Sequence, residues 1–190
     1  QETTFDALKY LVNCKETQKK QLMIIKHITN LVIAMALSQT LSAETNYFEA
    51  GKQTLADLIE IESTESAGLA TKASEYASEK LRSAGFGEDD LQIAGPTATT
   101  LGLAATLRGA GSGPPVIVMA HLDVVPAVTE SWDTNPYQMV EKNGFLYGRG
   151  TSDNKGGAAA LITTFIRLKT EGFIPDNDII MLLTGDEETQ

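Results

Sequence analysis

Apolar side chains recur every three or four positions in three segments of the chain. These segments, residues 46–62, 66–84 and 154–170, are predicted to be amphipathic helices because this spacing places the apolar positions on one helix face. Gly85 and Gly172 stand just past the second and third segments. A glycine there favours a helix end, since it adopts a positive φ without steric cost.

Two other segments are continuously apolar and too short for buried helices. Residues 116–120 (VIVMA) and 179–183 (IIMLL) are predicted to be strands that are covered on both faces. Strands that alternate with long helices favour an α/β layered fold with a mixed, mostly parallel sheet. The helix between these two strands favours a right-handed crossover, and therefore parallel pairing.

Two weaker strand signals complete the pattern. Residues 99–108 are rich in β-formers and precede a Gly/Ser/Pro loop at 109–115, which favours an outer strand followed by a turn. Asn143-Gly144 separates residues 138–142 from residues 145–147. An Asn-Gly pair between two such segments predicts a tight hairpin.

The N-terminal region has a different pattern. A basic start after Met23, an apolar run at 28–37 and small residues up to Ala43 are typical of a secretory signal peptide. On this interpretation residues 23–43 are the signal peptide, residues 1–22 are an upstream or artefactual segment, and residues 44–190 are catalytic domain. The protein would then be exported, to the periplasm or the medium. The alternative is one amphipathic helix over residues 5–37.

Charge and cysteine content narrow the function classes. The formal net charge is −10 and the sequence pI is about 4.6, which disfavours binding to nucleic acid. Cys14 is the single cysteine, so the chain cannot form an internal disulfide or a thiolate zinc cluster. We expect an incidental thiol, no partner nucleic acid and no stable membrane insertion after signal cleavage.

Polar groups that can carry chemistry follow the two apolar strands. His121 and Asp123 come after the first strand, and Glu187 and Glu188 come after the second. Ligands bind beyond the carboxyl ends of strands in open α/β sheets, so parallel strands would bring these side chains to one edge.

The residue types suit a divalent metal ion, because imidazole and carboxylate bind zinc when no thiolate is present. Asp123 can hold the second nitrogen of His121 and fix its tautomer. Each residue also has a simpler interpretation. His121 could be a hydrogen-bonded structural histidine, and Glu187-Glu188 could be a solvated acidic turn.

Three segments together resemble a known family. HLDVVP (121–126), GRGTSDNKGG (148–157) and TGDEE (184–188) are similar to motifs of the co-catalytic zinc metallopeptidases of clan MH. This family includes aminoacylases, carboxypeptidases, dipeptidases and succinyl-diaminopimelate desuccinylase. The resemblance, which covers about residues 50–190, implies a three-layer zinc-exopeptidase-like fold, truncated in this chain.

The resemblance also implies a role for each candidate residue. His121 and Glu188 would each bind one of two divalent metal ions, expected to be Zn²⁺, and Asp153 would bind both. Asp123 would orient His121, and Glu187 would be the general base. The peptide after Asp153 is expected to be cis. Arg149 and Lys155 could pair with the acidic groups or be purely structural.

The family function implied is zinc-dependent hydrolysis of peptide or N-acyl amide bonds. The substrate would be a small peptide or an N-acyl amino acid, and the complete protein could be a homodimer. Further metal ligands and the dimerisation domain of the family do not lie within 1–190, so this chain alone is expected to be inactive. The alternatives are an N-acyl-amino-acid deacylase or desuccinylase of the same family, and a non-catalytic binding protein that keeps the fold.

Overall fold

The computed structural model describes residues 23, 26 and 47–189. The chain divides into two units, Gln1–Asn46 and Tyr47–Gln190. The segment 1–22 lies outside the described residues, as does the predicted signal peptide 23–43 apart from Met23 and Lys26. Among the described residues, no helix is long and apolar enough to cross a membrane.

The three predicted helices are confirmed within the second unit. Residues 47–60 are helical, α2 spans Ala70–Ser83 and α3 spans Lys155–Thr170. α2 begins four residues later than predicted because the chain first turns at Gly68, whose φ is +65°. Short 3₁₀ turns occupy Glu88–Asp90 (η1) and Thr129–Ser131 (η2).

The central sheet has four strands in the order β1-β2-β6-β3. Their bounds are Leu91–Ala94, Gly102–Leu107, Ile179–Thr184 and Val116–His121, in that spatial order. β3 pairs with β6 in parallel, as the crossover through α3 predicted. The other two pairings, β1 with β2 and β2 with β6, are antiparallel. The sheet is mixed, as predicted, but the expectation that it is mostly parallel is wrong for the described strands.

The predicted hairpin forms a separate two-stranded sheet. β4 spans Val140–Lys142 and pairs antiparallel with β5, Phe145–Tyr147. Asn143 and Gly144 have φ values of +56° and +79°. Two consecutive positive φ values are what a tight hairpin turn of this twist requires, so the Asn-Gly signal was correct.

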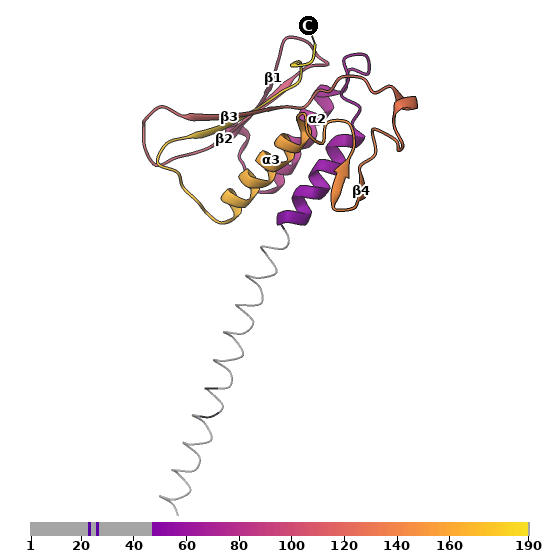
Figure 1. Ribbon diagram of the computed structural model, residues 1–190. Helices are drawn as coiled ribbons and strands as arrows, with labels where there is room; N and C mark the ends of the chain where they lie inside the picture. Colours follow the sequence, from indigo (N-terminus) through magenta and orange to yellow (C-terminus); the bar gives the residue numbers. More distant parts are fainter. Residues whose placement is uncertain (1–22, 24–25, 27–46, 190) are drawn as a thin grey trace, which may run out of the picture. The chain divides into compact units, whose positions relative to one another are not determined.

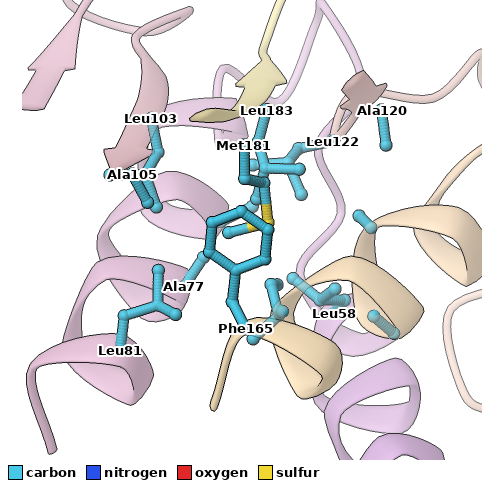
Figure 2. Close-up of a cluster of buried hydrophobic side chains, with 14 of the residues drawn as sticks. Leu58, Ala77, Leu81, Leu103, Ala105, Ala120, Leu122, Phe165, Met181 and Leu183 are labelled. Carbon is cyan, nitrogen blue, oxygen red and sulfur yellow. The ribbon is translucent and has the colours of Figure 1, made fainter. Parts of the chain in front are cut away.

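The core lies between the sheet and the helices. Leu103, Met181 and Leu183 project from the strands, while Leu58 and Phe165 project from helices, and all five are at most 2% exposed. Figure 2 shows these side chains meeting between the strands and the helical layer. Figure 1 shows α2, α3 and helix 47–60 on the same side of the sheet.

The opposite face of the sheet is open among the described residues. Ile117 and Met119 of β3 are 56% and 60% exposed. The prediction that this strand is covered on both faces is therefore wrong for residues 47–189. This part of the chain forms two layers, sheet and helices, and the third layer implied by the family resemblance is not among the described residues.

Candidate metal centre

Two parallel strands end side by side at the edge of the sheet. In the register of β3 and β6, His121 is paired with Thr184, and the backbone of Leu122 donates a hydrogen bond to Thr184 O at 2.8 Å. The polar segments 121–123 and 184–188 consequently leave the sheet at the same place. The structure thus brings together the groups that the strand pattern predicted to share one edge.

Both ring nitrogens of His121 face oxygen atoms. Nδ1 lies 3.0 Å from the backbone oxygen of Asp123, and Nε2 lies 2.9 Å from Oδ1 of Asp153. A carbonyl oxygen can only accept a hydrogen bond, so Nδ1 carries a proton and donates a hydrogen bond to the backbone oxygen of Asp123. In neutral imidazole the lone pair is then on Nε2, the nitrogen that faces the acidic groups.

The pKa of His121 reflects this environment. Burial lowers the pKa of the imidazole, but hydrogen bonds to Asp153 and Asp123, with the charges of Asp123 and Glu187, outweigh burial and leave it above its ordinary value. The acidic groups around Nε2 therefore favour a positive charge at this position, whether a proton or a metal ion supplies it.

Asp123 is buried beside the imidazole and is 1% exposed. Its Oδ2 accepts a hydrogen bond from the backbone N–H of Glu188 at 2.7 Å. Its Oδ1 lies 3.5 Å from Nδ1 of His121 and has no hydrogen-bond partner among the described residues. A buried carboxylate oxygen without a donor is costly unless positive charge is close by.

The two adjacent glutamates lie next to the histidine. His121, Glu187 and Glu188 each offer a ligand atom, and these atoms all lie within 4.8 Å of one another. The Glu187 carboxylate is 3.9 Å from Nε2 of His121, and 60% of its side chain is exposed. Both glutamates are therefore close enough to reach a common ion, and the base and ligand roles expected for them remain predictions.

Asp153 reaches the same nitrogen from the loop before α3. Its side chain is 78% exposed, apart from its contact with Nε2. The peptide between Asp153 and Asn154 is cis, as the resemblance implied. His121 is thus the residue that contacts both Asp153 and the Glu187-Glu188 pair.

The donor set fits a divalent metal ion. One imidazole nitrogen, which has a lone pair for a metal ion when it carries no proton, is oriented by a carbonyl through the other ring nitrogen and meets at least three carboxylates. Zinc takes these ligands in sites without thiolate, and the unpartnered Oδ1 of Asp123 beside the imidazole suits a ring polarised by a cation. These residues fit a metal centre, and their individual roles stay predictions.

Among the described residues, neither Arg149 nor Lys155 forms an ion pair with the acidic groups, which was one of the two expected alternatives. Arg149 places its guanidinium over the ring of Trp132, 5.4 Å from the centroid. Lys155 is fully buried and donates to the backbone oxygens of Leu58 and Ile61 at 2.8 and 2.7 Å. Burial lowers the pKa of Lys155 to about 7, although the charges of Asp123 and Glu62 oppose this shift.

The sequence did not predict that Lys155 is buried. A signal was present, because a lysine in the first turn of a helix is unfavourable next to the positive end of the helix dipole. Ser63, whose hydroxyl donates to Leu122 O at 2.6 Å, was also missed. Nothing in the local sequence distinguishes Ser63 from an ordinary loop serine.

A mixed α/β sheet with a histidine and several carboxylates at its strand ends is an arrangement that can hold a divalent metal ion. Residues 117–190 match the model of peptidase family M20/M25/M40. The resemblance inferred from the three motifs is therefore confirmed. The match begins in β3 and includes the candidate residues from His121 to Glu188.

Individual relatives agree with this family. The chain is 44% identical over 82 residues to a probable succinyl-diaminopimelate desuccinylase of Staphylococcus aureus, covering 42% of this chain and 20% of that protein. It is 40% identical over 84 residues to the N-fatty-acyl-amino acid synthase/hydrolase PM20D1 of Bos taurus, covering 44% of this chain and 17% of that protein.

The fold also matches a solved relative. Human carnosine dipeptidase 1 superposes with a TM-score of 0.63 at 25% identity, over 77% of this chain and 33% of that protein. The chain thus spans about a fifth of the curated relatives that it matches and a third of this structure.

Proposed function

We propose that the complete protein carrying this chain is a zinc-dependent hydrolase of peptide or N-acyl amide bonds, of the dipeptidase or carboxypeptidase type. The observation that carries the proposal is the position of His121. Its Nε2 lies 2.9 Å from Asp153 and 3.9 Å from Glu187, in a cluster that also contains Glu188. The family match over 117–190 supports the same conclusion.

The residues of the cluster would have different roles. His121, Asp153 and Glu188 would hold two divalent metal ions, together with ligands from the rest of the complete protein. Metal ions bound there would polarise a substrate carbonyl and lower the pKa of a water molecule. Asp123 would orient His121, because its backbone oxygen accepts a hydrogen bond from Nδ1. Nε2 would then be the nitrogen that binds the metal ion.

Glu187 is proposed as the general base. Its carboxylate is largely exposed, so substrate and water can reach it, and it lies beside the metal-binding nitrogen of His121. It would accept a proton from the attacking water and later pass this proton to the leaving amine. An exposed carboxylate can make this transfer only if it is held close to the reacting atoms. The hydrogen bond from the neighbouring Glu188 N–H to Asp123 provides that restraint.

The alternative substrate class is an N-acyl amino acid. The identities of 44% and 40% to proteins named as a desuccinylase and an N-fatty-acyl-amino acid hydrolase favour this second candidate. Purified complete protein, loaded with Zn²⁺, should be assayed against dipeptides, N-succinyl and N-fatty-acyl amino acids in parallel. Dipeptide hydrolysis supports the first proposal, and acyl release alone supports the second. Zinc binding without hydrolysis of any of these would favour a non-catalytic binding protein.

Export of the protein is part of this proposal. The pattern from Met23 to Ala43 supports a cleaved signal peptide, and scavenging of peptides outside the cytoplasm suits a dipeptidase. Mass spectrometry of protein recovered from the periplasm or medium should show a start near Glu44. Exported protein that retains residues 23–43 would contradict cleavage.

A further inference from the structure

Lys155 is the largest side chain among those fully buried in the described residues. It occupies the first position of α3, two residues after Asp153. Burying a long cationic side chain at the positive end of a helix is unfavourable in two ways, through desolvation and through the helix dipole. A position of this kind requires a compensating interaction.

The compensation comes from a different helix. The Lys155 amine donates to Leu58 O at 2.8 Å and to Ile61 O at 2.7 Å, across 97 and 94 positions of sequence. These carbonyls stand at the end of helix 47–60, where backbone oxygens lack partners within the helix and the dipole is negative. The charged amine has three hydrogens and the neutral amine has two, so either form can donate to both carbonyls.

The segment that accepts these hydrogen bonds also supports the strand end of His121. Ser63 N donates to Ile61 O at 2.7 Å, and the Ser63 hydroxyl donates to Leu122 O at 2.6 Å. The backbone N–H of Val124 donates to Ser63 O at 3.1 Å. Residues 61–63 are therefore bonded on one side to the start of α3 and on the other to the residues that follow His121.

We propose that Lys155 is a positioning residue that holds Asp153 at its distance from His121 through segment 58–63. The path runs from Asp153 along two residues to Lys155, then through Ile61 and Ser63 to Leu122, which adjoins His121. Metal binding is sensitive to small changes in ligand spacing, so this path would set the affinity of the centre. The inference rests on the proposed metal-dependent function.

The first test replaces Lys155 in the complete protein. Lys155→Met keeps a linear apolar side chain and removes the amine, and with it both hydrogen bonds. Lys72→Met is the control because Lys72 is an exposed lysine of α2. Zinc affinity should be measured by calorimetric titration of ZnCl₂ into the metal-free protein. We expect Lys155→Met to weaken zinc binding about 10–100-fold, the usual effect of losing a residue that supports a ligand. Lys72→Met should bind zinc as the wild type does.

A second pair of variants tests the same path without changing Lys155. Ser63→Ala removes the hydrogen bond to Leu122 O. The control is Thr54→Ala, which removes the hydroxyl of another buried side chain whose bond, to Ala50 O, stays within helix 47–60. Both should lower the melting temperature of the metal-free protein, but Ser63→Ala alone should weaken zinc binding. This pair keeps the proposal testable if Lys155→Met does not fold.

The outcomes separate this inference from the proposed function. Wild-type protein that binds no zinc overturns the proposed function and the positioning role with it. Wild-type protein that binds zinc, with a folded Lys155→Met or Ser63→Ala variant of equal affinity, overturns the positioning role alone. A loss of melting temperature without any change in zinc affinity is the result expected of a purely structural lysine, and it also overturns the proposal.

Discussion

The carboxylate of Asp123 accepts a 2.7 Å hydrogen bond from the backbone N–H of Glu188, 65 positions further along the chain. Asp123 follows the end of β3, and Glu188 follows the end of β6. The same carboxylate lies 3.5 Å from Nδ1 of His121. One buried side chain therefore contacts both segments that supply candidate ligands, and it links their positions.

This relationship predicts the effect of Asp123→Asn. The variant keeps the shape of the side chain and can still accept from Glu188, but it removes the negative charge beside the imidazole. We expect zinc affinity to fall about 10–100-fold, as is usual when a carboxylate next to a metal-binding histidine is lost. Titration with ZnCl₂ measures this change. Asp89→Asn, at an exposed carboxylate of η1, is the control and should leave zinc affinity unchanged.

Glu187 and Glu188 are adjacent, but replacing each of them by glutamine should have a different effect on activity and zinc content. Glu187→Gln removes the proposed proton acceptor, so kcat in the complete enzyme should fall about 10²–10⁴-fold while zinc stays bound. Glu188→Gln weakens a proposed ligand, so zinc per subunit should fall, and excess zinc should restore part of the activity. Metal analysis and kcat for both variants test the assignment.

Both glutamates lie in the same cluster with His121, so the opposite result is structurally possible. Loss of zinc in Glu187→Gln, with zinc retained in Glu188→Gln, would show that the two roles are exchanged. If neither variant changes activity, the hydrolase proposal is wrong.

Removal of metal should destabilise the complete protein. His121, Glu187 and Glu188 place ligand atoms within 4.8 Å, and the two carboxylates repel each other unless a cation lies between them. A ligand present at about 100 times its dissociation constant adds about 2.7 kcal/mol to the free energy of unfolding. Calorimetric melting should therefore occur at a lower temperature after treatment with chelator and recover with added zinc. His121→Ala should show a much smaller response to zinc, and equal responses would contradict the site.

Local sequence patterns were sufficient to predict most elements near the site. Helical spacing located α3, and the Asn143-Gly144 pair located the hairpin of β4 and β5. The parallel pairing of β3 and β6 followed from the helix between them, and it accounts for the approach of His121 to the Glu187-Glu188 pair. These predictions succeeded because each depends on interactions within a few residues or on the handedness of one connection.

Long-range relationships could not be predicted in the same way. β1, at Leu91–Ala94, was not predicted because it is four residues long and partly exposed. The apolar run of β3 indicated two covered faces, yet Ile117 and Met119 are exposed, since hydropathy does not show which neighbours are present. The hydrogen bonds of Lys155 to Leu58 and Ile61 span more than ninety positions, and only the fold brings these residues together.

Tyr76 provides a test of the helical layer at high pH. Its hydroxyl donates to the Asp57 carboxylate, which joins α2 to helix 47–60. Burial, with further contributions from the hydrogen bond to Asp57 and its charge, raises the pKa of Tyr76 well above its ordinary value of 10.0. In the unfolded chain this tyrosine ionises near pH 10, whereas in the folded chain it stays neutral. The unfolded state therefore loses a proton first, and the free energy of unfolding must fall as the pH rises above 10.

Tyr76→Phe cannot ionise, so its free energy of unfolding should fall less steeply between pH 10 and 11 than that of the wild type. Near pH 8 the variant should be about 1.5–3 kcal/mol less stable, because it lacks a hydrogen bond to a charged acceptor. Urea unfolding of the complete protein at pH 8, 10 and 11 measures both effects. Tyr147→Phe is the matched control, since Tyr147 is 45% exposed in the hairpin. Parallel pH profiles for the wild type and Tyr76→Phe would show that the contact between Tyr76 and Asp57 does not form in solution.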